Sequence, residues 1–287
     1  MIKIERSNLC EIANNYLGKL KEKGYNKKNN NTLQKHWVKN KDRIIKSNDL
    51  KGIIKEFQAI RDQTGFDEFK NYMKGQYKEL FYEREIGYWL AKQLDVKTCP
   101  YCNRQYTFTI ETQKGGSDEK HIRPEFDHFY SKSEHPCLAL SFYNLIPSCS
   151  ICNRIKSDDV IDINPYENGF GNEYKFILKT KDSQEPFNWA LNEDVDIDFL
   201  DENENIKVFG LKELYNEHID YVKEIINKAQ AYNYSYYSSL IDSYKGLGYQ
   251  EEDIDRFIWG NYIENAEHEK RPLSKLTKDI LEQLKIP

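Results

Sequence analysis

The sequence predicts an α+β protein that is mostly helical, with a small strand-containing module at its centre. Apolar residues recur at steps of three or four through 66–94 and again through 211–244, which is typical of amphipathic helices. Between these helical stretches, short runs rich in alternating or β-branched residues predict strands at 106–110, 125–129 and 145–148. A short helix is expected to start near Ser150, directly after the last of these strands. The order strand, loop, strand, helix predicts a ββα unit.

Length and composition bound the organisation of the chain. A chain of 287 residues can bury one sizeable core with an attached subdomain, and 14% aromatic residues exclude a disordered chain. We therefore expect a helical N-terminal region (1–95), a central module (96–165) and a mixed, then helical, C-terminal region (166–287). Because no stretch has the uninterrupted apolar length of a signal or membrane segment, we expect a cytoplasmic protein.

The N-terminal region is basic. Residues 1–50 hold 12 Lys/Arg against 5 Asp/Glu, whereas residues 181–220 hold 3 against 12. Residues 27–32 are polar and predict a loop between two helical pieces. The lysines could track phosphates or simply form a solvated helical face. We interpret the aromatic residues of 66–94 as core.

The C-terminal region begins with a turn-rich stretch at 164–171. Short strand-like runs within 170–200 predict a small β element. A helix is expected over 211–244, and a last helix has Pro272 in its first turn.

Four of the six cysteines form two Cys-x-x-Cys pairs: Cys99, Cys102, Cys149 and Cys152. Four thiolates in two such pairs can close a tetrahedral Zn²⁺ site, and a closed site is structural. A redox pair would not explain two matching copies, and a zinc deaminase needs an upstream His-x-Glu that is lacking here. We expect the two remaining cysteines, Cys10 and Cys137, to be ordinary buried side chains.

An Asp-His dipeptide, Asp127-His128, lies between the cysteine pairs. Phosphodiester hydrolysis needs a base for water and a cation for the developing charge. The imidazole of His128 suits the first task, and the carboxylate of Asp127, a hard oxygen ligand, suits the second with Mg²⁺ or Mn²⁺. For an isolated pair, plain structural hydrogen bonding would be the better interpretation, and the bracketing cysteines favour chemistry.

Two segments of the central module form a longer pattern: Phe126-Asp127-His128 and Asn144-Leu145-Ile146-Pro147-Ser148-Cys149-x-x-Cys152-Asn153-x-x-Lys156. Over about sixty residues, this pattern resembles the HNH endonuclease motif of the ββα-metal nucleases. The resemblance implies that His128 is the general base, Asp127 a metal ligand and Asn144 the residue that orients the base through the loop. Asn153 stands where the family has its second metal ligand, usually a His, so the resemblance implies an HNN variant with a weaker ligand.

A looser similarity in motif layout links the chain to anti-phage HNH proteins of the Septu and retron-associated type, with Asn164-Pro165-Tyr166 downstream. This resemblance implies a defence nuclease that works with an ABC-type ATPase partner.

Several side chains near the motif have two interpretations. Lys132, Arg154 and Lys156 are placed to contact nucleic-acid phosphates. Arg154 and Lys156 could instead form an ordinary solvated face of the predicted helix. Glu125 could join the metal shell but is expected to face solvent. His121 and His135 are rival bases, and neither sits beside a carboxylate. The other histidines, His36, His218 and His268, are expected on surfaces or helix faces.

The sequence thus predicts an endonuclease that hydrolyses DNA with one divalent cation, while Zn²⁺ holds the fold. A non-catalytic zinc-stapled module that binds nucleic acid or protein is the main alternative, because a carboxamide is a weak metal ligand. An RNase is the other, since a site that reads phosphates does not exclude RNA.

Overall fold

The computed structural model describes residues 1–24, 31–60, 65–83, 85–112, 120–180, 195–232 and 234–285. The chain divides into two compact units. The motif unit comprises Ile4–Val96 and Thr107–Glu167, and the terminal unit comprises Met1–Lys3, Lys97–Tyr106 and Asn168–Pro287. This grouping differs from the three consecutive segments predicted from the sequence, because the N-terminal helices pack on the loop of the central motif.

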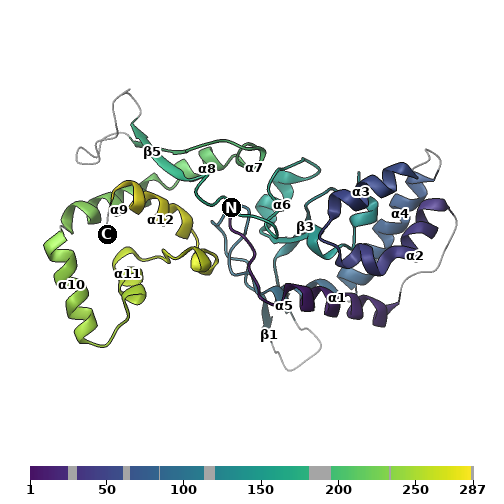
Figure 1. The fold of residues 1–287 in the computed structure, drawn as a ribbon, viewed down its shortest axis with the longest axis horizontal. Coiled ribbons are helices and arrows are strands. Elements are labelled where there is room, and N and C mark those ends of the chain that lie inside the picture. The colour runs from purple at the N-terminus through teal and green to yellow at the C-terminus, as the bar shows by residue number, and fades with distance from the viewer. Residues whose placement is uncertain are drawn as a thin grey trace. The chain divides into compact units, whose positions relative to one another are not determined.

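The motif unit is helical around small sheets (Figure 1). Its helices are α1 (Leu9–Lys23), α2 (Thr32–Lys46), α3 (Leu50–Ala59), α4 (Phe66–Tyr77), the π-helical segment η1 (Lys78–Glu83), α5 (Ile86–Leu94), the 3₁₀ turns η2 (Pro136–Leu138) and η3 (Phe142–Asn144), and α6 (Ser150–Lys156). Its strands are β1 (Ile110–Thr112), β2 (Lys120–Ile122), β3 (Glu125–His128) and β4 (Leu145–Ser148).

The terminal unit has one hairpin and its own set of helices (Figure 1). They are β5 (Phe176–Thr180), β6 (Val195–Phe199), α7 (Glu204–Val208), α8 (Leu211–Asn216), α9 (Ile219–Ala231), α10 (Tyr234–Gly246), α11 (Glu251–Trp259), the 3₁₀ turn η4 (Asn265–Lys270) and α12 (Ser274–Gln283). Among the described residues, each sheet is an antiparallel pair of consecutive strands: β1 with β2, β3 with β4, and β5 with β6.

The strand, loop, strand, helix order predicted for the centre of the chain is present. β3 pairs with β4 in a register that sets Asp127 opposite Ile146 and His128 opposite Leu145. α6 follows β4 directly and packs on β3. The predicted strand at 145–148 and the helix from Ser150 agree with β4 and α6.

The long loop between β3 and β4 rests on α2, α3 and α4. Trp37, fully buried on α2, donates its indole N–H to the carbonyl oxygen of Cys137 (3.1 Å). The Ser141 hydroxyl donates to the carbonyl oxygen of Ile44 at the other end of α2 (3.0 Å). Because buried hydrogen bonds of this kind are costly to leave unmade, the N-terminal helices fix the loop that carries part of the motif.

The single helix expected over 66–94 is interrupted. α4 ends at Tyr77, the chain continues as π-helix, and Glu85 adopts the left-handed conformation (φ 57°) before α5 begins. A Cβ on Gly87 would lie 2.6 Å from the Phe81 ring, so glycine permits this close return of the chain. The apolar period runs through the break in the sequence because α4, η1 and α5 each bury one face in the core.

The helix expected over 211–244 is instead α8, α9 and α10. Asn216 ends α8 because its side chain pairs with β6: its Oδ1 accepts from Ile197 N–H (2.8 Å) and its Nδ2 donates to Ile197 O (2.7 Å). The predicted β element within 170–200 is the β5–β6 hairpin. The last helix begins at Ser274, two residues after Pro272.

The hairpin predicted around 106–110 is shifted. Tyr106 makes only an isolated bridge with Thr98, and the strand β1 begins at Ile110. Its expected turn at 114–118 lies outside the described residues, as does most of the loop at 27–32. Along the described parts of the chain, none of the helices combines the length and the apolar character needed to cross a bilayer.

Candidate functional site

The four cysteines of the two Cys-x-x-Cys pairs lie together. Cys99, Cys102, Cys149 and Cys152 are buried, and their sulfur atoms all lie within 4.8 Å of one another. Sulfurs about 2.3 Å from a central Zn²⁺ stand about 3.8 Å apart in a tetrahedron. Four buried cysteines this close together could bind a structural zinc, as the sequence predicted.

The backbone around each pair is arranged to support thiolates. Arg104 N–H points to the sulfur of Cys102 and Cys152 N–H to the sulfur of Cys149, each at 3.4 Å. Asn103 adopts the left-handed conformation (φ 47°), and its buried side chain donates to the Thr98 hydroxyl (3.0 Å). N–H donors aimed at sulfur favour its charged form, which is the form that binds metal.

The second cluster is formed by β3 and α6. Glu125 and Asp127 are two residues apart on β3, so their side chains share one face of the strand. Asn153 and Lys156, about one turn apart on α6, contact them there. Asn153 Nδ2 donates to Glu125 Oε2 (2.6 Å), and Lys156 Nζ lies 3.3 Å from Asp127 Oδ2. Glu125 is exposed, as expected, whereas Asp127 is only 3% exposed.

The imidazole of His128 is held from two sides. Its Nε2 lies 3.0 Å from the carbonyl oxygen of Ala139, in the loop between β3 and β4. A carbonyl oxygen only accepts, so Nε2 carries the hydrogen and Nδ1 keeps its lone pair. The Tyr77 ring packs edge-on against the imidazole, with 4.6 Å between centroids.

The surroundings of His128 keep its imidazole neutral. Burial, followed by the charges of Lys132 and Lys156, lowers the pKa of His128 to about 3, while its bond to Ala139 opposes this shift. The side chain is 6% exposed. A neutral ring with its lone pair on Nδ1 is the form that a general base requires, and a pKa this far below neutrality makes it a weaker base than a solvated imidazole.

The side chain of Asn144 makes its hydrogen bonds within the loop between β3 and β4. Its Oδ1 accepts from Tyr130 N–H (2.8 Å), and its Nδ2 donates to Tyr130 O (3.0 Å) and Leu138 O (3.2 Å). Leu138 directly precedes Ala139, whose carbonyl holds His128. The fully buried amide therefore sets the position of the loop that orients the imidazole.

We expect Asn144→Ala to lower the free energy of unfolding by about 1–3 kcal/mol, because buried loop groups lose their partners. Urea denaturation of the zinc-loaded protein measures this. Asn164→Ala is the control: Asn164 is also buried and bonds the loop-end residue Tyr143 (3.2 Å), but it has no bond near Ala139. Equal stability of Asn144→Ala and the unsubstituted protein would contradict this role.

The three residues predicted to contact phosphates differ in exposure. Arg154 is exposed on α6. Lys132 is half-buried, with its ammonium 5.1 Å from the centre of the Tyr77 ring, and burial lowers its pKa. Lys156 is 0% exposed, and its Nζ donates to the carbonyl oxygen of His128 (2.8 Å). Its assignment as a phosphate contact is therefore corrected: a fully buried ammonium with internal partners faces β3, not a ligand in solution.

The two groups that hold His128 could not be assigned to it from the sequence. Tyr77 is a core residue, as the sequence predicts, but its contact with His128 depends on the fold, and any residue at position 139 supplies a carbonyl. Tyr77 is the last residue before the π-helical segment, a distortion that is frequent at functional sites. Among the rival bases, His135 packs its ring on Tyr130 at 5.8 Å, and the side chain of His121 lies outside the described residues.

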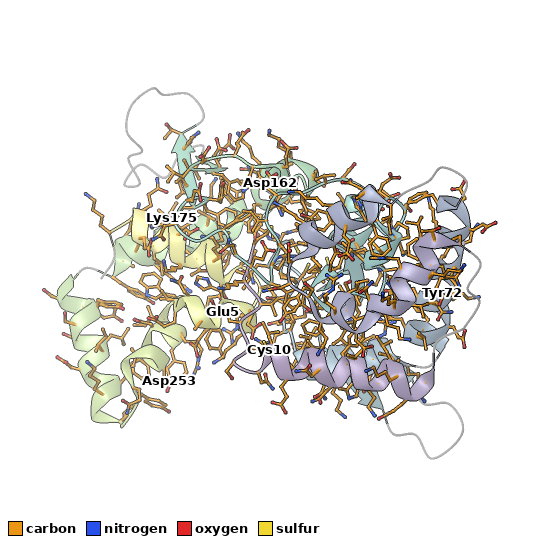
Figure 2. All side chains as sticks on the ribbon, turned by 45° about the vertical axis from the view of Figure 1, so that its right-hand side comes forward. Glu5, Cys10, Tyr72, Asp162, Lys175 and Asp253 are labelled. Carbon is orange, nitrogen blue, oxygen red and sulfur yellow. The ribbon has the colours of Figure 1, made fainter. Side chains whose placement is uncertain are left out.

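Other expectations need smaller corrections. Cys10, on α1 (Figure 2), is exposed, whereas Cys137 is buried as expected, and burial raises the pKa of its thiol to about 12. His268 is 5% exposed instead of lying on a surface, because its Nε2 bonds to Ile263 O (3.1 Å).

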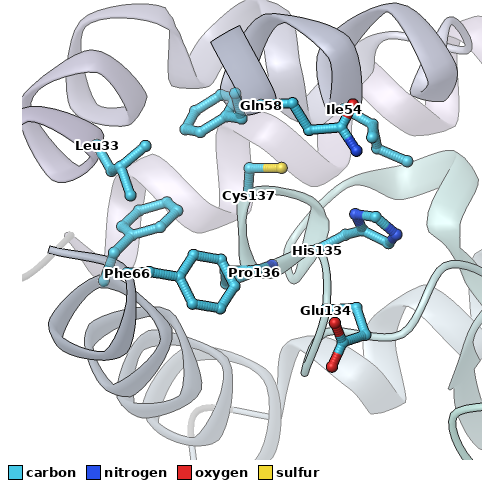
Figure 3. A pocket seen from close by; sticks show the side chains of 10 residues that line it. Leu33, Ile54, Gln58, Phe66, Glu134, His135, Pro136 and Cys137 are labelled. Atoms are coloured by element: carbon cyan, nitrogen blue, oxygen red, sulfur yellow. The ribbon is translucent and has the colours of Figure 1, made fainter. Parts of the chain in front are cut away.

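A small pocket lies beside the loop (Figure 3). Apolar side chains of α2, α3 and α4 face Glu134, His135, Pro136 and Cys137 across it. Its volume of about 30 Å³ is room for one or two water molecules.

Comparisons with known proteins identify no relative. No family model, no curated protein and no solved structure matches the chain.

Proposed function

We propose that the protein is a metal-dependent HNH-type endonuclease that hydrolyses DNA phosphodiester bonds. One observation carries the proposal: His128 Nε2 is bound to the Ala139 carbonyl, which directs the lone pair to Nδ1, and Asp127 precedes it on the same strand. A neutral imidazole held one residue along the strand from a buried carboxylate supplies the two residue types that a base and a cation ligand require.

His128 would take a proton from the attacking water at Nδ1, while its Nε2–H stays on Ala139 and steadies the ring. Asn144 would hold that carbonyl in place through the loop. Arg154 and Lys132 would bind backbone phosphates, which supply most sequence-independent affinity. The tautomer assigned to His128 is thus what a base needs, with no rearrangement of hydrogen bonds.

The proposed catalytic ion would lie on the α6-facing side of β3. Asp127 and Asn153 would hold Mg²⁺ or Mn²⁺, with Glu125 beside them, because carboxylate and carboxamide oxygens suit these ions. The Asn153 amide donates its N–H to Glu125, so its Oδ1 is the atom that would serve as the ligand. When bound, the ion would stabilise the leaving 3′ oxygen, leaving 5′-phosphate ends.

The burial of the site favours a second candidate function, a zinc-stapled module that binds nucleic acid or protein without cleaving it. Asp127 is 3% and His128 6% exposed, so substrate and water reach them only if the site opens. Exposed Arg154 would still bind phosphates in such a module.

The proposal is tested by incubating the zinc-loaded protein with supercoiled plasmid, a DNA duplex and a matched RNA in Mg²⁺ or Mn²⁺. We expect nicked DNA whose ends a ligase can reseal, and no reaction in EDTA. Preferential cleavage of the RNA would make the protein an RNase, and DNA binding without nicking would favour the second candidate.

The looser resemblance to anti-phage nucleases supports a further part of this proposal, namely an ABC-type ATPase as partner. Co-purification with an ATPase encoded by a neighbouring gene tests it, and the plasmid assay should be repeated with that ATPase present.

A further inference from the structure

Lys156, the last residue of α6, is enclosed at the candidate site. It is 0% exposed, and its ammonium donates to the carbonyl oxygen of His128 at 2.8 Å. The same ammonium lies 3.3 Å from Asp127 Oδ2, in a carboxylate that is 4% exposed. Both of its partners are thus the last two residues of β3.

Burial of a lysine is expensive unless its charge is compensated. The effective penalty for burying one ion is several kcal/mol, and removing one partner of a buried pair leaves the other charge uncompensated. Asp127 and the His128 carbonyl together offset the cost for Lys156. The ion pair with Asp127 and the hydrogen bond to the His128 carbonyl therefore hold the end of α6 against the two residues of β3 that the proposed reaction uses.

The pair also bears on the binding of a divalent ion. An ion arriving at Asp127 meets a carboxylate whose charge is already balanced, with a like charge 3.3 Å from its oxygen. At such a distance in a buried site the repulsion is strong. Lys156 and the divalent ion are thus two cations that compete for one carboxylate.

We propose that Lys156 is a positioning residue that acts as the internal cation of Asp127 when no divalent ion is bound, and that it thereby weakens metal binding at this site. The metal part of this inference rests on the proposed function. The ion-pair part does not.

The test measures Mn²⁺ binding by calorimetry, and thermal unfolding with and without Mn²⁺, for zinc-loaded variants. Without Mn²⁺, Lys156→Met should melt below the unsubstituted protein, and Lys156→Met combined with Asp127→Asn should melt above Lys156→Met alone. Lys156→Met should bind Mn²⁺ at least about tenfold more tightly, within the range of about 5–150-fold for coupled sites. Mn²⁺ should also raise the melting temperature of Lys156→Met by more than it raises that of the unsubstituted protein.

Lys275→Met is the matched control. Lys275 is 4% exposed and pairs with buried Asp279 (2.7 Å) in α12. Its loss should lower the melting temperature without changing Mn²⁺ affinity. If Lys156→Met does not fold, Lys156→Gln keeps a donor for His128 O while removing the charge.

The inference is overturned if Lys156→Met binds Mn²⁺ no more tightly than the unsubstituted protein, or if adding Asp127→Asn gives no recovery of melting temperature. Cleavage of DNA with unchanged Mn²⁺ affinity would reject this inference and leave the proposed function standing. Tighter Mn²⁺ binding in a protein that never cleaves would reject the function and leave the inference.

Discussion

Replacing His128 by alanine is expected to reduce DNA cleavage by about 10²–10⁴-fold, the usual contribution of a general base. The structure gives the reason, because His128 is the imidazole whose tautomer is fixed by Ala139 and which follows Asp127 on β3. Single-turnover cleavage of a labelled duplex measures the effect.

Two further variants separate chemistry from folding. His128→Gln keeps a side-chain donor for the Ala139 carbonyl but lacks a base, so it should be as inactive as the alanine variant while melting closer to the unsubstituted protein. His135→Ala removes a half-buried imidazole from the same loop and should retain cleavage. Cleavage retained in both His128 variants would remove His128 from the mechanism.

Replacing Cys152 by serine is expected to unfold the β3–β4–α6 module and to release zinc. Cys152 lies in the first turn of α6, and its sulfur lies within 4.8 Å of the three other cysteine sulfurs. Structural zinc contributes about 10–16 kcal/mol to the folding of small zinc domains, so losing a ligand has a large effect. Zinc content by mass spectrometry and protease sensitivity measure it.

Cys10→Ser is the control for this prediction, because Cys10 is exposed and lies outside the cluster. It should leave zinc content and protease sensitivity unchanged. A folded Cys152→Ser protein with a full complement of zinc would show that the cluster does not hold the ion.

The strands and the helix of the motif could be predicted from local pattern. Residues 145–148 have the strand composition of β4, and the helix expected near Ser150 is α6. The long amphipathic helices were harder, because an apolar period continues across a break when each piece faces the same core. Neither the left-handed Glu85 nor the bonds of Asn216 to β6 interrupt that period.

The candidate site was predictable in its residue types and only partly in its contacts. Spacing alone predicted that the four cysteines meet. The burial of Lys156 was not predictable, because a lysine on a short helix is normally solvated. Asp127 becomes its partner only through the packing of α6 on β3. The Ala139 carbonyl was invisible, since any residue at that position supplies one.

The central claim is that a cation held near Asp127 and a base at His128 cleave DNA while zinc holds the fold. The most direct measurement is plasmid nicking by the zinc-loaded protein in Mn²⁺, run beside His128→Gln and with DNA binding measured in the same samples. The account predicts nicking by the unsubstituted protein and equal binding without nicking by the variant. Equal binding by both proteins with no nicking by either, even with the proposed ATPase present, would contradict it.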